Sequence, residues 1–133
     1  MKSHEDLVRK AVICVGSQTA LAAGINELRP SRASDPDASQ STVSKWARGA
    51  TKEVGHGNAL YIDILTGGFV AYSDFYPLHS TVFDRVETPS SRDRRKAARI
   101  RWNQHIKAKA AAVEKRAARE RAAQDRVAQK AAA

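Results

Sequence analysis

The last third of the chain contains no glycine and no proline, and this absence is the strongest constraint on its fold. Residues 92–133 consist mainly of Ala, Arg, Lys, Glu and Gln, which all favour α-helix. Ile106, Val113 and Val127 fit a seven-residue spacing, but Glu120 occupies the intervening position and makes a poor coiled-coil seam. We therefore expect a basic Ala/Arg-rich tail that is helical or, without a packing partner, disordered.

Charge divides the chain near the same place. The full sequence has 23 Lys and Arg against 14 Asp and Glu, a net charge of +9. Residues 1–88 carry nine basic and ten acidic side chains, and residues 89–133 carry fourteen and four, so the net charges are −1 and +10. This asymmetry predicts a folded domain at 1–80, a linker at 81–91 and a basic tail at 92–133 that favours a polyanion such as nucleic acid.

Several classes of protein are disfavoured by what the sequence lacks. Cys14 is the only cysteine, which excludes an internal disulfide and a cysteine zinc cluster and fits a reducing cytoplasm. We see no apolar run of about eighteen residues and no signal peptide, so we expect no membrane association. The four histidines are scattered, and no GxSxG motif occurs. We therefore expect no metal, no cofactor and no enzymatic activity.

Residues 1–80 have the pattern of a mainly α-helical domain with four to five short helices. Apolar spacing and capping residues predict helices at 4–15, 18–25, 40–48 and 59–65. Gly24 is expected to weaken or end the second of these helices, although residues 25–28 could prolong it to Arg29. Residues 69–72 have β character and predict a short strand or an extended arm. The segment 26–38, with two prolines, is expected to be an inserted loop.

The third expected helix has the residues that a recognition helix in the DNA major groove needs. The short polar side chains near its N-terminus, those of Gln40, Ser41 and Ser44, can approach base edges. Val43 and Trp46 lie three residues apart and are expected to bury the opposite face. This division of the helix predicts DNA recognition by its polar face.

Neighbouring residues add contacts to the DNA backbone. Lys45 and Arg48 can reach phosphates, and Lys45 can also reach a guanine edge. The second expected helix begins after Ser17, and its free amides and positive dipole end suit a phosphate. Gln18 and Thr19 can supplement those amides.

Two stretches of the sequence resemble a known family. The sequence GSQTALAA at 16–23, followed by STVSKWARG at 41–49, resembles the Cro-like helix-turn-helix proteins of phages and prophages, and in particular the YdaS-type group. Members of that group often continue with a Thr-Gly-Gly turn and an aspartate before an aromatic-proline pair. TGGFV at 66–70 and DFYP at 74–77 match that continuation, so the resemblance covers about residues 5–78.

The resemblance implies a Cro-like fold and a sequence-specific, double-stranded DNA-binding transcriptional regulator of phage or prophage origin, a repressor or a Cro-like protein. Carried over to this sequence, the base or groove contacts would be Gln40, Ser41, Ser44 and Lys45, and the backbone contacts Gln18, Thr19 and Arg48. The implied setting is the bacterial nucleoid or a phage-infected host, with binding as a homodimer and a basic tail that adds non-specific affinity.

The chain departs from the family in one respect. The family joins its second and third helices by a tight turn of about three or four residues, whereas here the segment 26–38 intervenes. That insertion, or the tail, could instead bind a protein partner. Three alternatives therefore stay open: an antitoxin that regulates its own toxin–antitoxin pair, a DNA-packaging subunit similar to phage small terminases, and an RNA-binding basic protein.

Overall fold

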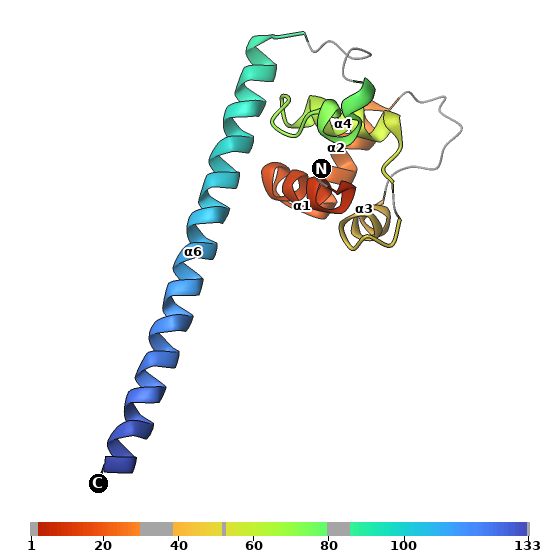
Figure 1. Ribbon diagram of the computed structural model, residues 1–133. Helices are drawn as coiled ribbons and strands as arrows, with labels where there is room; N and C mark the ends of the chain where they lie inside the picture. The colour runs from red at the N-terminus through yellow and green to blue at the C-terminus, as the bar shows by residue number, and fades with distance from the viewer. Residues whose placement is uncertain (1–2, 30–38, 52, 80–85, 133) are drawn as a thin grey trace. The chain divides into compact units, whose positions relative to one another are not determined.

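The computed structural model describes residues 3–29, 39–51, 53–79 and 86–132, and within them the chain is all-α (Figure 1). The helices are α1 (His4–Val15), α2 (Gln18–Leu28), α3 (Gln40–Ala47), α4 (His56–Leu65), α5 (Tyr72–Phe75) and α6 (Pro89–Ala132), with a 3₁₀ turn at Pro77–His79. The chain divides into two units, Met1–Trp102 and Asn103–Ala133, so α6 belongs partly to each. We call them the first unit and the second unit.

The first three predicted helices are confirmed, and each begins at a serine cap. The hydroxyls of Ser3, Ser17 and Ser39 accept hydrogen bonds from backbone N–H groups three residues later, at 3.2, 3.0 and 3.1 Å. Gly16 ends α1 with a φ of 123°, a conformation that L side chains rarely adopt.

Of the two expected ends of the second helix, the one near Gly24 is wrong and the longer one is confirmed, because α2 continues to Leu28. The glycine has a packing role instead. A Cβ at this position would lie 2.8 Å from the side chain of Leu65 in α4, so its absence permits the close approach of α2 and α4. The expected inserted loop at 26–38 is wrong for residues 26–28, which belong to α2, and residues 30–38 lie outside the described residues.

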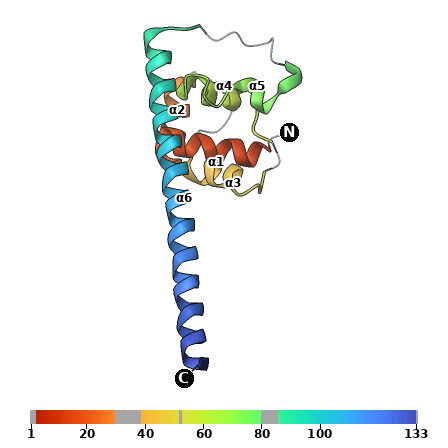
Figure 2. The same cartoon turned by 60° about the vertical axis from the view of Figure 1, so that its left-hand side comes forward.

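The core of the first unit lies among the four main short helices. α1 contacts α2 and α3, and α2 contacts α3 and α4, as two views of the ribbon show (Figures 1 and 2). The fully buried side chains include Leu7, Leu21, Ile25, Val43 and Ile62. Their burial removes a continuous apolar surface from water and holds the short helices together.

The expected β segment at 69–72 is wrong, because no strand is present among the described residues. The backbone N–H groups of this segment instead form hydrogen bonds with nearby side chains. The Thr66 hydroxyl accepts from the N–H of Val70 at 3.1 Å and donates to the carbonyl of Ile62 at 2.9 Å. The buried carboxylate of Asp63 accepts from the N–H of Tyr72 at 2.8 Å. These bonds turn the chain directly from α4 into α5, so no partner strand is needed.

The tail prediction is confirmed as a helix, and α6 begins at Pro89, inside the segment expected to be a linker. Thr88 caps its start, since its hydroxyl accepts from the N–H of Ser91 at 3.0 Å. In the part of the chain that the structure describes, no single helix is long and apolar enough to cross a membrane; α1 and α2 satisfy that test only as a pair bent by 91°.

Candidate nucleic-acid interface

The N-termini of α2 and α3 lie side by side, although the segment that joins them is long. The side-chain amide of Gln40 donates to the side-chain carbonyl of Gln18 at 3.4 Å. Both glutamines occupy the first position of their helix, directly after the capping residues Ser17 and Ser39. The structure therefore brings two of the predicted site residues together and presents two helix N-termini to the same region.

α3 has one buried face and one accessible face. Val43, Trp46 and Ala47 are 0%, 6% and 8% exposed, as the predicted apolar face requires. The predicted contact residues lie on the other side of α3, where Gln40, Ser41, Lys45 and Arg48 are exposed and Ser44 is half-buried. Positions 40, 41, 44, 45 and 48 share one face of an α-helix, so five of the seven predicted residues form a polar stripe along α3. Gln18 is half-buried and Thr19 exposed at the start of α2, beside that stripe.

The charge of this surface varies along α3. Its N-terminal end carries the free amides of the first turn and the neutral side chains of Gln40 and Ser41, which suit an anion or a base edge. Lys45 lies in the last turn, and Arg48 is the C-terminal cap residue. Cations at this end complement the helix dipole and remain accessible to a phosphate.

Arg9 in α1 holds the C-terminal end of α3, and sequence reasoning did not assign it this role. Its Nε donates to the carbonyl of Ala47 at 2.7 Å, and its guanidinium also pairs with Glu5 and, at 3.6 Å, with Asp6. A Cβ at Gly49, where φ is +73°, would collide with the Glu5 carboxylate. The spacing of Glu5 and Arg9 was a signal of their mutual ion pair, but only the tertiary fold shows that Arg9 reaches α3.

The start of α6 is held on the first unit by arginines that bind carbonyl groups at helix ends. Arg101 donates to the carbonyls of Cys14 and Val15, at 3.0 and 2.9 Å, and so occupies the C-terminus of α1. Arg95 donates from Nε to the carbonyl of Gly67 at 2.7 Å and also pairs with Glu87. These acceptors are carbonyls left without a partner where a helix or turn ends, which is where a cation is most favourable.

Apolar contacts complete the attachment of residues 89–102. Ala98 is 2% exposed, and Trp102 packs against the core. The Nζ of Lys10 lies 5.3 Å from the centre of the Trp102 ring and 4.6 Å from that of Phe69, so the cation bridges the two aromatic rings. Composition alone assigned residues 92–102 to the tail, because they have the same residue types as the rest of α6.

The Thr-Gly-Gly turn requires a glycine at position 67 because of its backbone conformation and its close packing. Its φ is +59°, and a Cβ there would collide with the backbone carbonyl of Ser91 and lie 2.6 Å from the N–H nitrogen of Arg95. The turn therefore lets the first two turns of α6 approach the end of α4. The motif that carries part of the family resemblance has a packing role in this chain.

Cys14, His4 and His56 are three further titratable residues of the first unit that have structural roles. Burial raises the pKa of the Cys14 thiol to about 11, against smaller opposing effects of Lys10 and Arg101, so the thiol stays protonated and weakly nucleophilic at neutral pH. Nδ1 of His4 accepts from the N–H of Val54 at 3.0 Å and its Nε2 bonds to the carbonyl of Phe75 at 2.9 Å, which ties α1 to α5. Nδ1 of His56 bonds to the Tyr72 hydroxyl at 2.6 Å.

Among the described residues, no group of three or more His, Cys, Asp and Glu side chains could hold a metal ion. No protein-family model, curated protein or solved structure matches the chain.

Proposed function

We propose that this chain is a sequence-specific DNA-binding transcriptional regulator of phage or prophage origin, a repressor or Cro-like protein, that inserts α3 into the major groove. The observation that carries the proposal is the contact between Gln18 and Gln40, which joins the N-termini of α2 and α3. The exposed polar stripe of α3 and the resemblance to YdaS-type proteins support it.

In the proposed complex, the two helices have different tasks. Gln40, Ser41 and Ser44 read base edges. The side-chain amide of Gln40 is suited to an adenine, to which it can both donate and accept a hydrogen bond. Lys45 reads a guanine edge or binds a phosphate. Gln18, Thr19 and the N-terminal amides of α2 bind one phosphate, and Arg48 binds another, so the backbone contacts set the angle at which α3 enters the groove.

Arg9 contributes to this proposal as a positioning residue. It holds the carbonyl of Ala47 at 2.7 Å and thereby connects the end of α3 to α1. A recognition helix must keep its pose against the rigid body of the domain for base contacts to discriminate, and this bond supplies a fixed point opposite the Gln18–Gln40 contact.

We propose binding as a homodimer to two-fold-related half-sites about one helical turn apart, in a bacterial cytoplasm, with no cofactor and no catalytic activity. The basic tail adds affinity for DNA of any sequence through counterion release. The expected insertion, which now begins after Leu28 at the end of α2, and the tail are candidate surfaces for a protein partner.

The test is a binding-site selection from random duplex DNA with the full chain, followed by the variant Gln40→Ala/Ser44→Ala. We expect a defined motif with two-fold symmetry for the natural chain, and a loss of roughly tenfold or more in preference for that motif in the variant. Gln104→Ala/Gln129→Ala is the matched control, because both glutamines are exposed in α6; it should keep the motif.

Unchanged preference in the Gln40→Ala/Ser44→Ala variant would exclude α3 as the reading helix. The mass of the particle in solution separates the proposal from its main rival. A ring-sized assembly indicates a DNA-packaging subunit, and a monomer or dimer agrees with the regulator.

A further inference from the structure

The second unit contributes residues 103–132 to α6, and its basic side chains are unevenly distributed around the helix. With about 100° of rotation per residue, Lys115, Arg119, Arg126 and Lys130 fall within an arc of about 60°. All four are exposed. At a rise of about 1.5 Å per residue they extend over about 22 Å of helix. We call these four residues the basic face.

The acidic side chains of the second unit lie elsewhere on the helix. Glu114, Glu120 and Asp125 are each about 80° or more from the nearest member of the basic face. Glu120 pairs with Arg116 at 3.5 Å, outside the basic face. The positive charge of the basic face is therefore not offset by a carboxylate on the same side of the helix.

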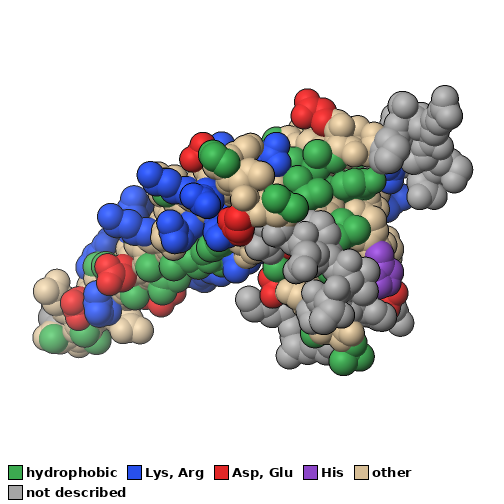
Figure 3. Space-filling view, turned by 90° about the horizontal axis from the view of Figure 1, so that it is seen from above, with side chains coloured by type: hydrophobic (Ala, Val, Ile, Leu, Met, Phe, Trp, Pro, Cys, Tyr) green, Lys and Arg blue, Asp and Glu red, His purple; other side chains and the backbone are tan. Residues whose placement is uncertain are grey.

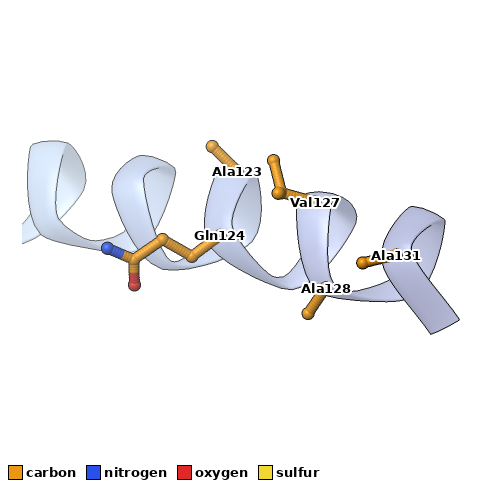
Figure 4. A pocket seen from close by; sticks show the side chains of 5 residues that line it. All are labelled: Ala123, Gln124, Val127, Ala128 and Ala131. Carbon is orange, nitrogen blue, oxygen red and sulfur yellow. The ribbon is translucent and has the colours of Figure 1, made fainter.

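Apolar residues occupy another side of the second unit. Val113 and Val127 are 62% and 68% exposed. Close to the end of α6, an open recess is lined by Ala123, Gln124, Val127, Ala128 and Ala131 (Figure 4). Figure 3 shows Lys and Arg side chains gathered along the long helix beside a separate row of hydrophobic side chains. The side that carries Val113 and Val127 also carries Glu120, so the basic face is the more uniform side of the helix.

We propose that Lys115, Arg119, Arg126 and Lys130 form a phosphate-contact face through which the second unit binds duplex DNA regardless of its sequence. The inference deepens the proposed function and rests on it for the choice of DNA as the polyanion. Each strand of duplex DNA carries one phosphate per about 3.4 Å of the helix axis, so a basic face of about 22 Å can follow several phosphates of one groove edge. By contrast, Arg95 and Arg101 already bind backbone carbonyls in the first unit.

Two other partners fit the second unit less well. A membrane surface favours amphipathic helices with Trp, Phe or Leu on the apolar side, and the sequence of residues 103–132 contains none of these. A second copy of the helix would bring together two segments that each carry eight basic and three acidic side chains, which repel each other. The charge distribution therefore favours a nucleic acid.

The test compares two quadruple variants of the full chain that remove the same charge from the same helix. The basic-face variant is Lys115→Gln/Arg119→Gln/Arg126→Gln/Lys130→Gln, and the matched control is Lys107→Gln/Lys109→Gln/Arg116→Gln/Arg121→Gln. Affinity for a duplex of random sequence is measured over a range of salt concentrations, and circular dichroism confirms equal helix content. We expect the slope of log K against log salt to fall by about 3 to 4 in the basic-face variant, at about 0.9 per phosphate contact, and by less than half of that in the control.

Equal losses in the two variants would overturn the inference, because they indicate diffuse net charge rather than a face. No loss in either variant would also overturn it, as would a larger effect on binding to phosphatidylserine-containing vesicles than to DNA. If the natural chain selects a motif but the basic-face variant keeps an unchanged salt slope, only this inference is contradicted. If the natural chain selects no motif but the basic-face variant shows the expected fall in slope, only the α3 assignment is contradicted.

Discussion

The two parts of α6 have similar sequences and very different surroundings. In residues 89–102, Ala98 is 2% exposed and Arg101 donates to two carbonyls at the end of α1. In residues 103–132, Val113 and Val127 are 62% and 68% exposed. The comparison teaches that an arginine in an Ala/Arg-rich helix has a structural role where the end of another helix offers it carbonyl groups. Where no such carbonyls lie nearby, as in the basic face, the arginine remains available to a partner.

Because residues 89–102 are packed and residues 103–132 are exposed, the tail can be removed without damage to the first unit only after residue 102. A deletion from residue 92 would take away Ala98 and the two carbonyl-binding arginines, Arg95 and Arg101, and would damage the first unit. A chain that ends at Trp102 keeps these contacts, so it is the suitable form in which to measure DNA recognition without the second unit.

The largest expected contrast between the two units is in the burial of aliphatic side chains. Leu21→Ala should lower the free energy of unfolding by about 3 kcal/mol, because Leu21 is fully buried and the cavity cannot close completely. Val113→Ala should change it by less than about 0.5 kcal/mol, because Val113 is exposed. Urea denaturation followed by tryptophan fluorescence measures both, and similar losses for the two variants would mean that Val113 is packed.

The next contrast concerns glycines rather than large side chains. Gly67→Ala should destabilise the first unit by about 1 to 3 kcal/mol, since φ is +59° and a Cβ would collide with the backbone of α6 at Ser91. Gly57→Ala is the matched control in α4, where a Cβ meets nothing within 4 Å; it should be neutral or stabilise by up to about 1 kcal/mol. Thermal unfolding distinguishes them, and a neutral Gly67→Ala would contradict the close approach of α6.

The smallest expected contrast tests the two kinds of arginine in α6. Arg101→Gln should cost about 1 kcal/mol and increase amide hydrogen exchange in residues 89–102, because the carbonyls of Cys14 and Val15 lose their donor. Arg119→Gln, in the basic face, should leave stability and exchange in the first unit unchanged. If both substitutions had the same effect on exchange, the capping role of Arg101 would be refuted.

Much of the helical content could be predicted from local sequence. Ser3, Ser17 and Ser39 are strong N-caps, and the apolar periodicity after each of them requires only one buried face per helix. The helical tail follows from its composition. The polar stripe of α3 was also predictable, because the positions of Val43 and Trp46 determine which side chains remain outside.

The errors occurred where side chains outside a segment decide the structure of that segment. Residues 69–72 have β character, but the side chains of Thr66 and Asp63 satisfy the backbone N–H groups of Val70 and Tyr72, and no strand forms among the described residues. Gly24 is a poor helix residue, yet α2 continues through it to Leu28, and Leu65 packs against it where a Cβ would not fit. Local propensity is worth only a few tenths of a kcal/mol to about 1 kcal/mol per residue, so tertiary packing overrides it.

The sequence by itself determined that the chain is helical, that its positive charge is concentrated after residue 88 and which side chains of residues 40–48 form the polar stripe, because these properties depend on composition and local spacing. Only the tertiary structure decided that Gln18 meets Gln40, that Arg9 holds the end of α3 and that the packed part of the chain extends to Trp102. These contacts join residues far apart in the sequence, and whether a polar group finds a partner depends on the positions of whole helices.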